Sequence, residues 1–407
     1  MEIQRKHRTI RASARRTALP AGERECPDLI CHRCGNRDIR LFGWDRGIPY
    51  CRRCVAFSRL DAGQSIPVPH LKPPVWNGQV HLEFELTVHQ KQVSDQILGW
   101  LRQGEPVFCY AAAGAGKTEI TFASIDWFLK QGKKVCFAIS RRQVVLEIAS
   151  RLQAAFPGLE VVPVCEGFTS VTDGDLIVCT THQLYRYPEA FDLLILDELD
   201  AFPYRGNALL EELARRSCRG VRLMLSATPD EDSLREISAG RMQAARLFRR
   251  PHGKLLPEPV FVLLPVWMQV IRLLFLQRRM RGKQILVFVP RIRDGKRLAR
   301  LLKCPCIHSQ SPDKDDIMNR FRHRDFDVLV STTLLERGIT VPSVQVIVLK
   351  GDHPVFTMAS LVQIFGRAGR SFHDPEGECL CLAASMSDSM KQCADLLRRM
   401  NESVCSA

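Results

Sequence analysis

The chemically most suggestive stretch of the sequence is VFCYAAAGAGKTEIT, residues 107–121, which has the pattern of a buried strand, a tight loop and the start of a helix. The loop has the spacing of a phosphate-binding loop, with Ala in place of the usual first Gly. Gly114 and Gly116 let backbone N–H groups turn inward around phosphate oxygens, and the helix start adds its dipole. Lys117 would neutralise charge on the β- and γ-phosphates, and the Thr118 hydroxyl is a suitable Mg²⁺ ligand. The pattern therefore predicts a site for ATP and Mg²⁺.

A second candidate for the same chemistry is LLILDELD, residues 193–200, where an apolar run ends on two adjacent acids. Ligands of open α/β sheets bind at the carboxyl ends of the strands, so Asp197 and Glu198 would face the phosphate-binding loop. Asp197 would hold Mg²⁺ through water, and Glu198 would polarise the attacking water. An acidic loop after a strand is common by itself. With a phosphate-binding loop about eighty residues upstream, it predicts nucleotide hydrolysis.

The elements that must position these residues form two series of apolar, strand-length runs separated by helix-like segments. The first series begins at Val107, Val135, Leu176, Leu193 and Arg222, and the second at Ile285, Asp327, Gln345 and Glu378. Runs that are apolar on both faces are typical of parallel sheets covered by helices, so we expect an α/β protein with two such domains in tandem. The predicted parts are a basic disordered arm (1–25), a four-cysteine module (26–60), a linker rich in Pro and Gly (61–78), a nucleotide-binding lobe (79–252) and a second lobe (253–407).

Four cysteines form a metal-binding pattern near the start of the chain. Two Cys-x-x-Cys pairs, Cys31 with Cys34 and Cys51 with Cys54, are separated by sixteen residues. Four thiolates satisfy the tetrahedral preference of Zn²⁺, and a module this small lacks an adequate core without a metal. Cys26 lies just outside the pairs and could compete as a ligand. The aromatic residues and arginines between the pairs suit base stacking or a small core with a solvated surface, so DNA and a protein both remain candidate partners of the module.

Charge and cysteine usage narrow the class of protein. The net charge is +14, and residues 1–60 hold 14 Lys or Arg against 6 Asp or Glu. This excess favours a nucleic acid or an anionic membrane surface as partner, with a solvated tail as the alternative. Most of the 16 cysteines lie singly in apolar runs, as reduced buried thiols do, so we expect a reducing compartment. No stretch reaches the ~18 uncharged apolar residues that a membrane helix requires.

Further motifs follow in an order that resembles the superfamily 2 helicases. The motifs are LTVHQKQ (86–92), DELD (197–200), SAT (226–228), STTLLERGITVP (331–342) and QIFGRAGR (363–370). The resemblance implies two RecA-like lobes with ATP bound on the first. It also implies that the SAT motif couples the ATP state to nucleic acid. Backbone phosphates of a nucleic acid would lie against residues 140–142 and 179–184, through contacts that do not depend on base sequence.

The same resemblance assigns roles around the nucleotide. Gln90 would recognise the adenine, and the backbone at Gly338 would approach the nucleotide. Gln363 would contact the γ-phosphate or the Asp197 region. Arg367 and Arg370 are spaced i and i+3, on one face of a predicted helix, and would reach across from the second lobe as arginine fingers that stabilise the γ-phosphoryl charge.

The cysteine module in front of the first lobe, together with DELDAFPYRGN, LSATP, TTLLERGIT and GRAGRS, is similar to the ComFA family of late-competence ATPases over roughly residues 26–400. The resemblance implies a cytoplasmic, DNA-stimulated ATPase at the inner face of the membrane. Such a protein would drive single-stranded DNA through the ComEC channel and associate with ComFC and DprA. A homo-oligomer is a further possible assembly.

Three alternatives stay open at this point. In a PriA-like replication-restart helicase the cysteines interrupt the helicase region, whereas here they precede it. An RNA helicase would share the same motifs. A zinc-bearing scaffold that binds nucleotide without turnover would have no need of Glu198, Arg367 and Arg370 together.

Overall fold

The computed structural model describes residues 29–405 except 201–202, 334–340, 342 and 373. The chain divides into two compact units, Met1–Ile66 and Pro67–Ala407. The predicted basic arm, Cys26 and Gly338 lie outside the described residues. Within the described ranges, no helix has both the length and the apolar character needed to cross a membrane.

The first unit is built on a hairpin. Strands β1 (Phe42–Asp45) and β2 (Ile48–Cys51) pair antiparallel, and two short 3₁₀ helices, η1 (Ile39–Leu41) and η2 (Val55–Phe57), flank them. Arg46 and Gly47 form the two-residue turn with φ values of 51° and 82°, as the right-handed twist of a hairpin favours. The buried apolar side chains of this unit are Cys31, Cys34, Phe42, Cys51, Cys54 and Leu60. Four of these six residues are cysteines, so the very small core of this unit is centred on the cysteine cluster.

The first lobe of the second unit is a parallel sheet. Its seven strands have the order β5-β6-β4-β7-β8-β3-β9. The elements in chain order are α1 (Val88–Arg102), β3 (Val107–Ala111), η3 (Glu119–Thr121), α2 (Phe122–Lys130), β4 (Val135–Ile139), α3 (Arg142–Ala155), β5 (Val161–Val164), β6 (Leu176–Thr180), η4 (Thr181–Arg186), β7 (Phe191–Asp197), α4 (Ala208–Ser217), β8 (Cys218–Ser226), α5 (Glu231–Ser238) and β9 (Gln243–Leu247).

The second lobe is a parallel sheet of six strands in the order β10-β15-β14-β11-β13-β12. Its elements are β10 (Val260–Leu263), α6 (Val266–Arg279), β11 (Gln284–Phe288), α7 (Ile292–Leu302), β12 (Cys306–Ile307), α8 (Lys314–Arg322), β13 (Val328–Ser331), β14 (Val344–Leu349), α9 (Met358–Phe365), β15 (Cys379–Ala383) and α10 (Asp388–Cys405). Two RecA-like parallel sheets therefore follow a four-cysteine module, which confirms the predicted fold class.

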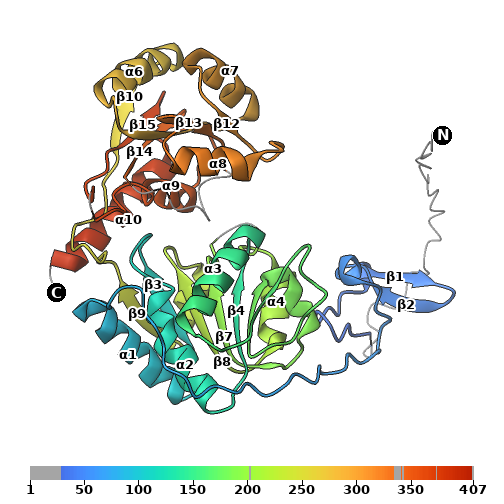
Figure 1. The fold of residues 1–407 in the computed structure, drawn as a ribbon. Coiled ribbons are helices and arrows are strands. Elements are labelled where there is room, and N and C mark those ends of the chain that lie inside the picture. The colour runs from blue at the N-terminus through green and yellow to red at the C-terminus, as the bar shows by residue number, and fades with distance from the viewer. Residues whose placement is uncertain (1–28, 201–202, 334–340, 342, 373, 406–407) are drawn as a thin grey trace, which may run out of the picture. The chain divides into compact units, whose positions relative to one another are not determined.

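Each central strand is buried on both faces because helices cover both sides of its sheet (Figure 1). In β11, Ile285 and Val287 pack with the apolar residues of α6 and α7, whereas Leu286 and Phe288 pack with those of α9 and α10. This alternation follows from the two-residue period of a strand. It leaves the ends of the strands, where the predicted site residues lie, as the accessible parts of the sheets.

A strap in front of α1, residues 72–81, is held against the first lobe by side chains. Trp76 is buried, its ring centroid lies 5.4 Å from that of Phe156, and its Nε1 donates to Asp126 Oδ1 at 2.8 Å. The buried ammonium of Lys134 donates to the Lys72 carbonyl at 2.7 Å and to Asp173 Oδ1 at 2.9 Å. Part of the segment that composition marks as a linker therefore contributes to the core of the first lobe.

Candidate nucleotide and zinc sites

The phosphate-binding loop connects β3 to η3. Gly114 and Gly116 have φ values of 78° and 86°, a region that L side chains rarely adopt. A Cβ at Gly116 would lie 2.3 Å from Gln90 Nε2, so the Gln90 amide lies directly against the loop. Lys117 Nζ lies 3.8 Å from Asp197 Oδ1, with side chains only 13% and 8% exposed. The loop and the acidic end of β7 therefore face each other, as the sequence predicts.

Gln90 connects α1 to this loop. It occupies the third position of α1, where its Oε1 accepts from Thr87 N at 2.9 Å and completes a capping box. Its Nε2 donates to the Ala115 carbonyl at 2.9 Å. The position beside the phosphate-binding loop is compatible with contact to a nucleotide, and the adenine-reading role stays a prediction.

The acids at the end of β7 have an unusual local backbone. Asp197 Oδ1 accepts from Glu198 N at 2.8 Å, and Glu198 has a φ of 57°. Burial raises the pKa of Asp197 to about 6, while the neighbouring Lys117 opposes the shift. The buried Asp197 carboxylate, together with the hydroxyl of Thr118, the chain neighbour of Lys117, offers the hard oxygen ligands that Mg²⁺ prefers. These residues therefore fit a magnesium–nucleotide complex.

The next acid along, Asp200, links this loop to the SAT motif and was not among the predicted site residues. Ser226 Oγ donates to Asp200 Oδ1 at 2.9 Å, and Thr228 Oγ1 donates to Asp200 Oδ2 at 3.0 Å. All three side chains are buried. The hydrogen bonds join the ends of β7 and β8, so the acidic loop and the SAT motif form one connected structure.

The motif at residues 363–370 differs from expectation in one respect. Helix α9 ends at Phe365, so Arg367 and Arg370 lie in the turn that follows and not on one face of a helix. Gly366 is the C-cap of α9, and Gly369, with a φ of 63°, takes a left-handed conformation in the turn that follows. Gln363 is still within α9, is 4% exposed, and its Nε2 has no hydrogen-bond partner in the described part of the chain.

This turn brings Arg370 to the phosphate-binding loop. A Cβ at Gly114 would lie 3.3 Å from Arg370 Cγ. Burial lowers the pKa of Arg370, and the carboxylates of Glu198 and Glu147 partly oppose the shift. Arg367, three residues earlier in the chain, is also buried, with 5% of its surface exposed. The predicted finger Arg370, the loop and Glu198 are thus gathered in one region of the second unit.

The two segments predicted to hold nucleic-acid phosphates follow neighbouring strands. Ser140 comes directly after β4, and Thr181 comes directly after β6, which pairs with β4. Both hydroxyls are buried without a hydrogen-bond partner among the residues described. Arg142, in contrast, donates from Nε to the Glu166 carbonyl at 2.8 Å. The buried hydroxyls have donors unused within the described ranges and the exposed Arg142 remains accessible, so the contact of both segments with a backbone phosphate stays a prediction.

The four cysteines of the first unit form a compact cluster. Their sulfur atoms are buried and lie within 4.8 Å of one another, with Cys31 Sγ 3.5 Å from Cys54 Sγ and Cys34 Sγ 3.6 Å from Cys51 Sγ. Tetrahedral Zn–S bonds of about 2.3 Å would place sulfurs about 3.8 Å apart. Hydrogen bonding with Cys31 raises the pKa of the Cys34 thiol. Asn36 Nδ2 also donates to Cys51 Sγ at 4.0 Å. The cluster fits Zn²⁺.

Comparison with known proteins agrees with this geometry. A family model described as DEAD/DEAH box helicase matches residues 87–237, and one described as helicase conserved C-terminal domain matches residues 266–372. Dbp5 of Saccharomyces cerevisiae, in a structure with RNA and ADP BeF3, shares the fold with a TM-score of 0.59 at 16% identity, over 76% of this chain and 87% of that one. Fold and site together define a helicase-like ATPase of superfamily 2.

Two curated relatives give the family. The chain is 31% identical to competence protein ComFA of Streptococcus pneumoniae, over 94% of this chain and 93% of the relative. It is also 31% identical to competence protein ComFA of Bacillus subtilis, over 91% and 85% of the two chains. The chain belongs to the ComFA family.

Proposed function

We propose that this chain is an ATP-driven motor that moves single-stranded DNA during the uptake of transforming DNA. The observation that carries the proposal is the gathering of Lys117, Asp197, Glu198 and Arg370 around one phosphate-binding loop. A module that only binds nucleotide needs the loop but gains nothing from a positioned acid and an arginine finger. Family membership supports the competence role.

In this proposal each residue has a separate task. Thr118 and Asp197 hold Mg²⁺, which supplies charge neutralisation on the phosphates when it is bound. Lys117 holds the β- and γ-phosphates, and Glu198 orients and polarises the attacking water. Phosphoryl transfer spreads negative charge over the γ oxygens, and Arg370 stabilises it. Gln363 Nε2, which has no hydrogen-bond partner in the described ranges, is a donor that suits the γ-phosphate.

The finer parts of the proposal concern partners and location. Residues 140–142 and 179–184, which follow β4 and close β6, would contact DNA phosphates. The family resemblance adds ComFC, DprA and the ComEC channel as partners, and a cytoplasmic position at the inner face of the membrane. The cysteine module would be an accessory element that contacts DNA or one of these proteins.

The test is steady-state phosphate release measured side by side with single-stranded DNA, duplex DNA and RNA. The proposal predicts the largest stimulation by single-stranded DNA, without strand separation of a forked duplex. Stimulation by RNA alone would favour an RNA helicase, and unwinding that depends on a fork would favour a replication-restart helicase. Absence of turnover with every nucleic acid would leave only a nucleotide-binding scaffold.

A further inference from the structure

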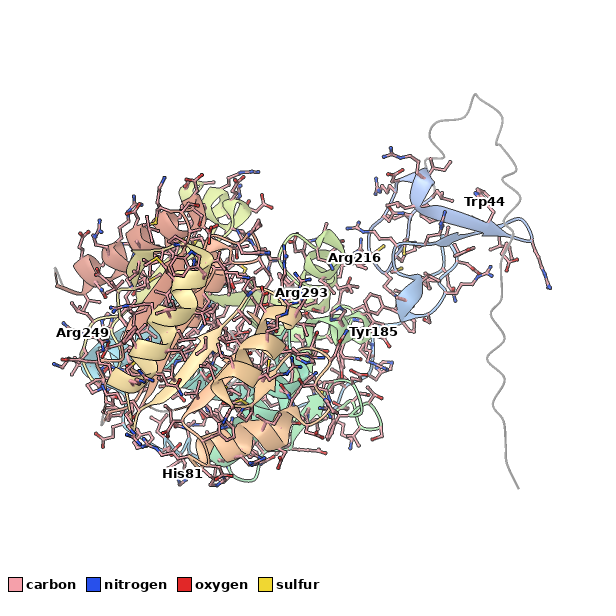
Figure 2. All side chains as sticks on the ribbon, turned by 90° about the horizontal axis from the view of Figure 1, so that it is seen from above. Trp44, His81, Tyr185, Arg216, Arg249 and Arg293 are labelled. Atoms are coloured by element: carbon pink, nitrogen blue, oxygen red, sulfur yellow. The ribbon has the colours of Figure 1, made fainter. Side chains whose placement is uncertain are left out.

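The largest fully buried side chain among the described residues is an arginine outside every motif. Arg250 lies in the connection between β9 and β10 and is 1% exposed. Its neighbour Arg249 is exposed and is labelled at the edge of the molecule in Figure 2. Burial of an arginine is unfavourable unless hydrogen bonds or ion pairs compensate for the loss of hydration of its charge.

Among the described residues, the guanidinium of Arg250 donates four hydrogen bonds, and all four go to main-chain carbonyls. Nε donates to Ala113 O at 3.0 Å, within the phosphate-binding loop. On the other side, Nη2 donates to Gly366 O at 2.9 Å, and Nη1 donates to Ala368 O at 2.7 Å and to Gly369 O at 2.6 Å. One planar guanidinium therefore joins the loop that would hold ATP to the turn that carries Arg367 and Arg370.

The chemistry of this contact requires an arginine. The carbonyls at the end of α9 have no partners within the helix, and a cation is favourable there because of the helix dipole. Only a guanidinium presents donors in a rigid fork wide enough to span both sides, whereas a lysine offers its donors from a single point. Burial lowers the pKa of Arg250 to about 9, with a further contribution from the nearby charge of Arg370, so the side chain is still protonated at neutral pH.

Glycines allow the two backbones to approach. A Cβ at Gly366 would lie 2.5 Å from the Ala113 Cβ. A Cβ at Gly369 would lie 2.4 Å from Pro375 O and 3.2 Å from Arg250 Nη1. His252 adds a second contact from the same connection, with Nε2 2.9 Å from Gly369 O. The turn is thus held from the segment that connects the lobes as well as from its own helix.

We propose that Arg250 is a positioning residue for ATP hydrolysis, which holds the turn at residues 366–370 against the phosphate-binding loop and thereby fixes Arg370 relative to the nucleotide. Arg250 acts through backbone carbonyls and through Arg370, so its loss affects the rate of hydrolysis more than the binding of nucleotide. This inference rests on the proposed function of Arg370 as a finger.

The test compares Arg250→Gln and Arg250→Lys with wild type, and uses Arg249→Gln as the matched control. Phosphate release at saturating single-stranded DNA gives kcat, and a fluorescent ATP analogue gives the dissociation constant. A misplaced catalytic group typically lowers turnover by ~10²-fold. We expect that loss for Arg250→Gln, a loss of at least ~10-fold for Arg250→Lys, and dissociation constants within about 3-fold of wild type. Arg249→Gln should match wild type.

A double variant separates positioning from general damage to the fold. If Arg250 acts through Arg370, Arg250→Lys combined with Arg370→Ala should turn over no more slowly than Arg370→Ala alone, because losses that share one cause do not add. The inference would be overturned if the double variant showed the product of the two single losses in turnover. It would also be overturned if Arg250→Lys turned over like wild type. If Arg250→Gln does not fold, Arg250→Lys decides. Absence of turnover in wild type would instead remove the proposed function.

Discussion

Replacement of Thr228 by valine tests whether the acidic loop and the SAT motif form one connected structure. The Thr228 hydroxyl, 3% exposed, donates to Asp200 Oδ2 at 3.0 Å. Valine keeps the volume of the side chain and replaces the hydroxyl with a methyl group. Asp200 would keep its hydrogen bond from Ser226, at 2.9 Å, and lose the one from Thr228.

The expected loss of stability in Thr228→Val depends on the charge of the hydrogen-bond acceptor, Asp200. A hydrogen bond to a charged group contributes roughly 1.5–3 kcal/mol to the free energy of unfolding. For a domain of the size of the first lobe, each kcal/mol shifts the melting temperature by roughly 2–4 °C. Thr228→Val should therefore melt about 3–12 °C below wild type. Thr228→Ser keeps the hydroxyl and loses a methyl group. This should lower the free energy of unfolding by about 0.8 kcal/mol and the melting temperature by roughly 2–3 °C.

The assay is thermal unfolding followed by circular dichroism, with the three proteins in the same buffer without nucleotide. The order of stability should be wild type, then Thr228→Ser, then Thr228→Val. If packing alone mattered at this position, serine would be the more damaging substitution, and that order would refute the reasoning. The ratio of DNA-stimulated to basal ATP turnover should fall in the same order.

Three further substitutions address other parts of the molecule. Arg370→Ala should lower ATP turnover by ~10³-fold with little change in ATP affinity, and equal losses in both would indicate a structural role. Replacement of Cys51 and Cys54 by serine should release zinc, as measured by metal analysis against wild type, and a wild-type protein purified without zinc would contradict the site. Trp76→Ala should destabilise the first lobe by about 3–5 kcal/mol in urea unfolding. Exposed Val75→Ala is its control, expected within about 0.5 kcal/mol of wild type.

The central strands of both sheets could be predicted from the sequence because each is a continuous apolar run. The nine predicted runs correspond to β3, β4, β6, β7, β8, β11, β13, β14 and β15. The edge strands carry a weaker signal. Strand β9 has the sequence QAARL, which mixes polar and apolar residues, and β12 is only two residues long. Pairing with a neighbouring strand, and not local composition, makes these segments extended.

The site residues that belong to motifs with a fixed local spacing could be predicted from the sequence. Arg250 could not be, because its role depends on main-chain carbonyls that are distant in the sequence. Lys117 and Asp197 lie in recognisable motifs, and the structure brings them together. Arg250 lies in the basic, proline-containing stretch RRPHGKLLPEP, which looks like exposed surface in the sequence. Its burial depends on carbonyls at Ala113 and Gly366, and main-chain acceptors leave no pattern in the sequence.

The helix predicted through Arg367 and Arg370 was wrong for a related reason. The spacing of the two arginines suits a helix, but α9 ends at Phe365, and Gly369 takes a positive φ. The turn exists because the backbone packs closely against Ala113 and Arg250. The conformation of residues 366–370 is therefore determined by tertiary contacts and not by the local spacing of the arginines.

The central claim, that ATP hydrolysis moves this protein along single-stranded DNA, is tested most directly by single-turnover translocation. The protein is bound to single strands of increasing length that carry a fluorophore at one end, and ATP is added with a trap for free protein. The account predicts a lag before the fluorescence change that grows in proportion to strand length, and no ATP-dependent change with Lys117→Ala. A lag independent of length in the wild-type protein, with ATP consumed, would contradict it.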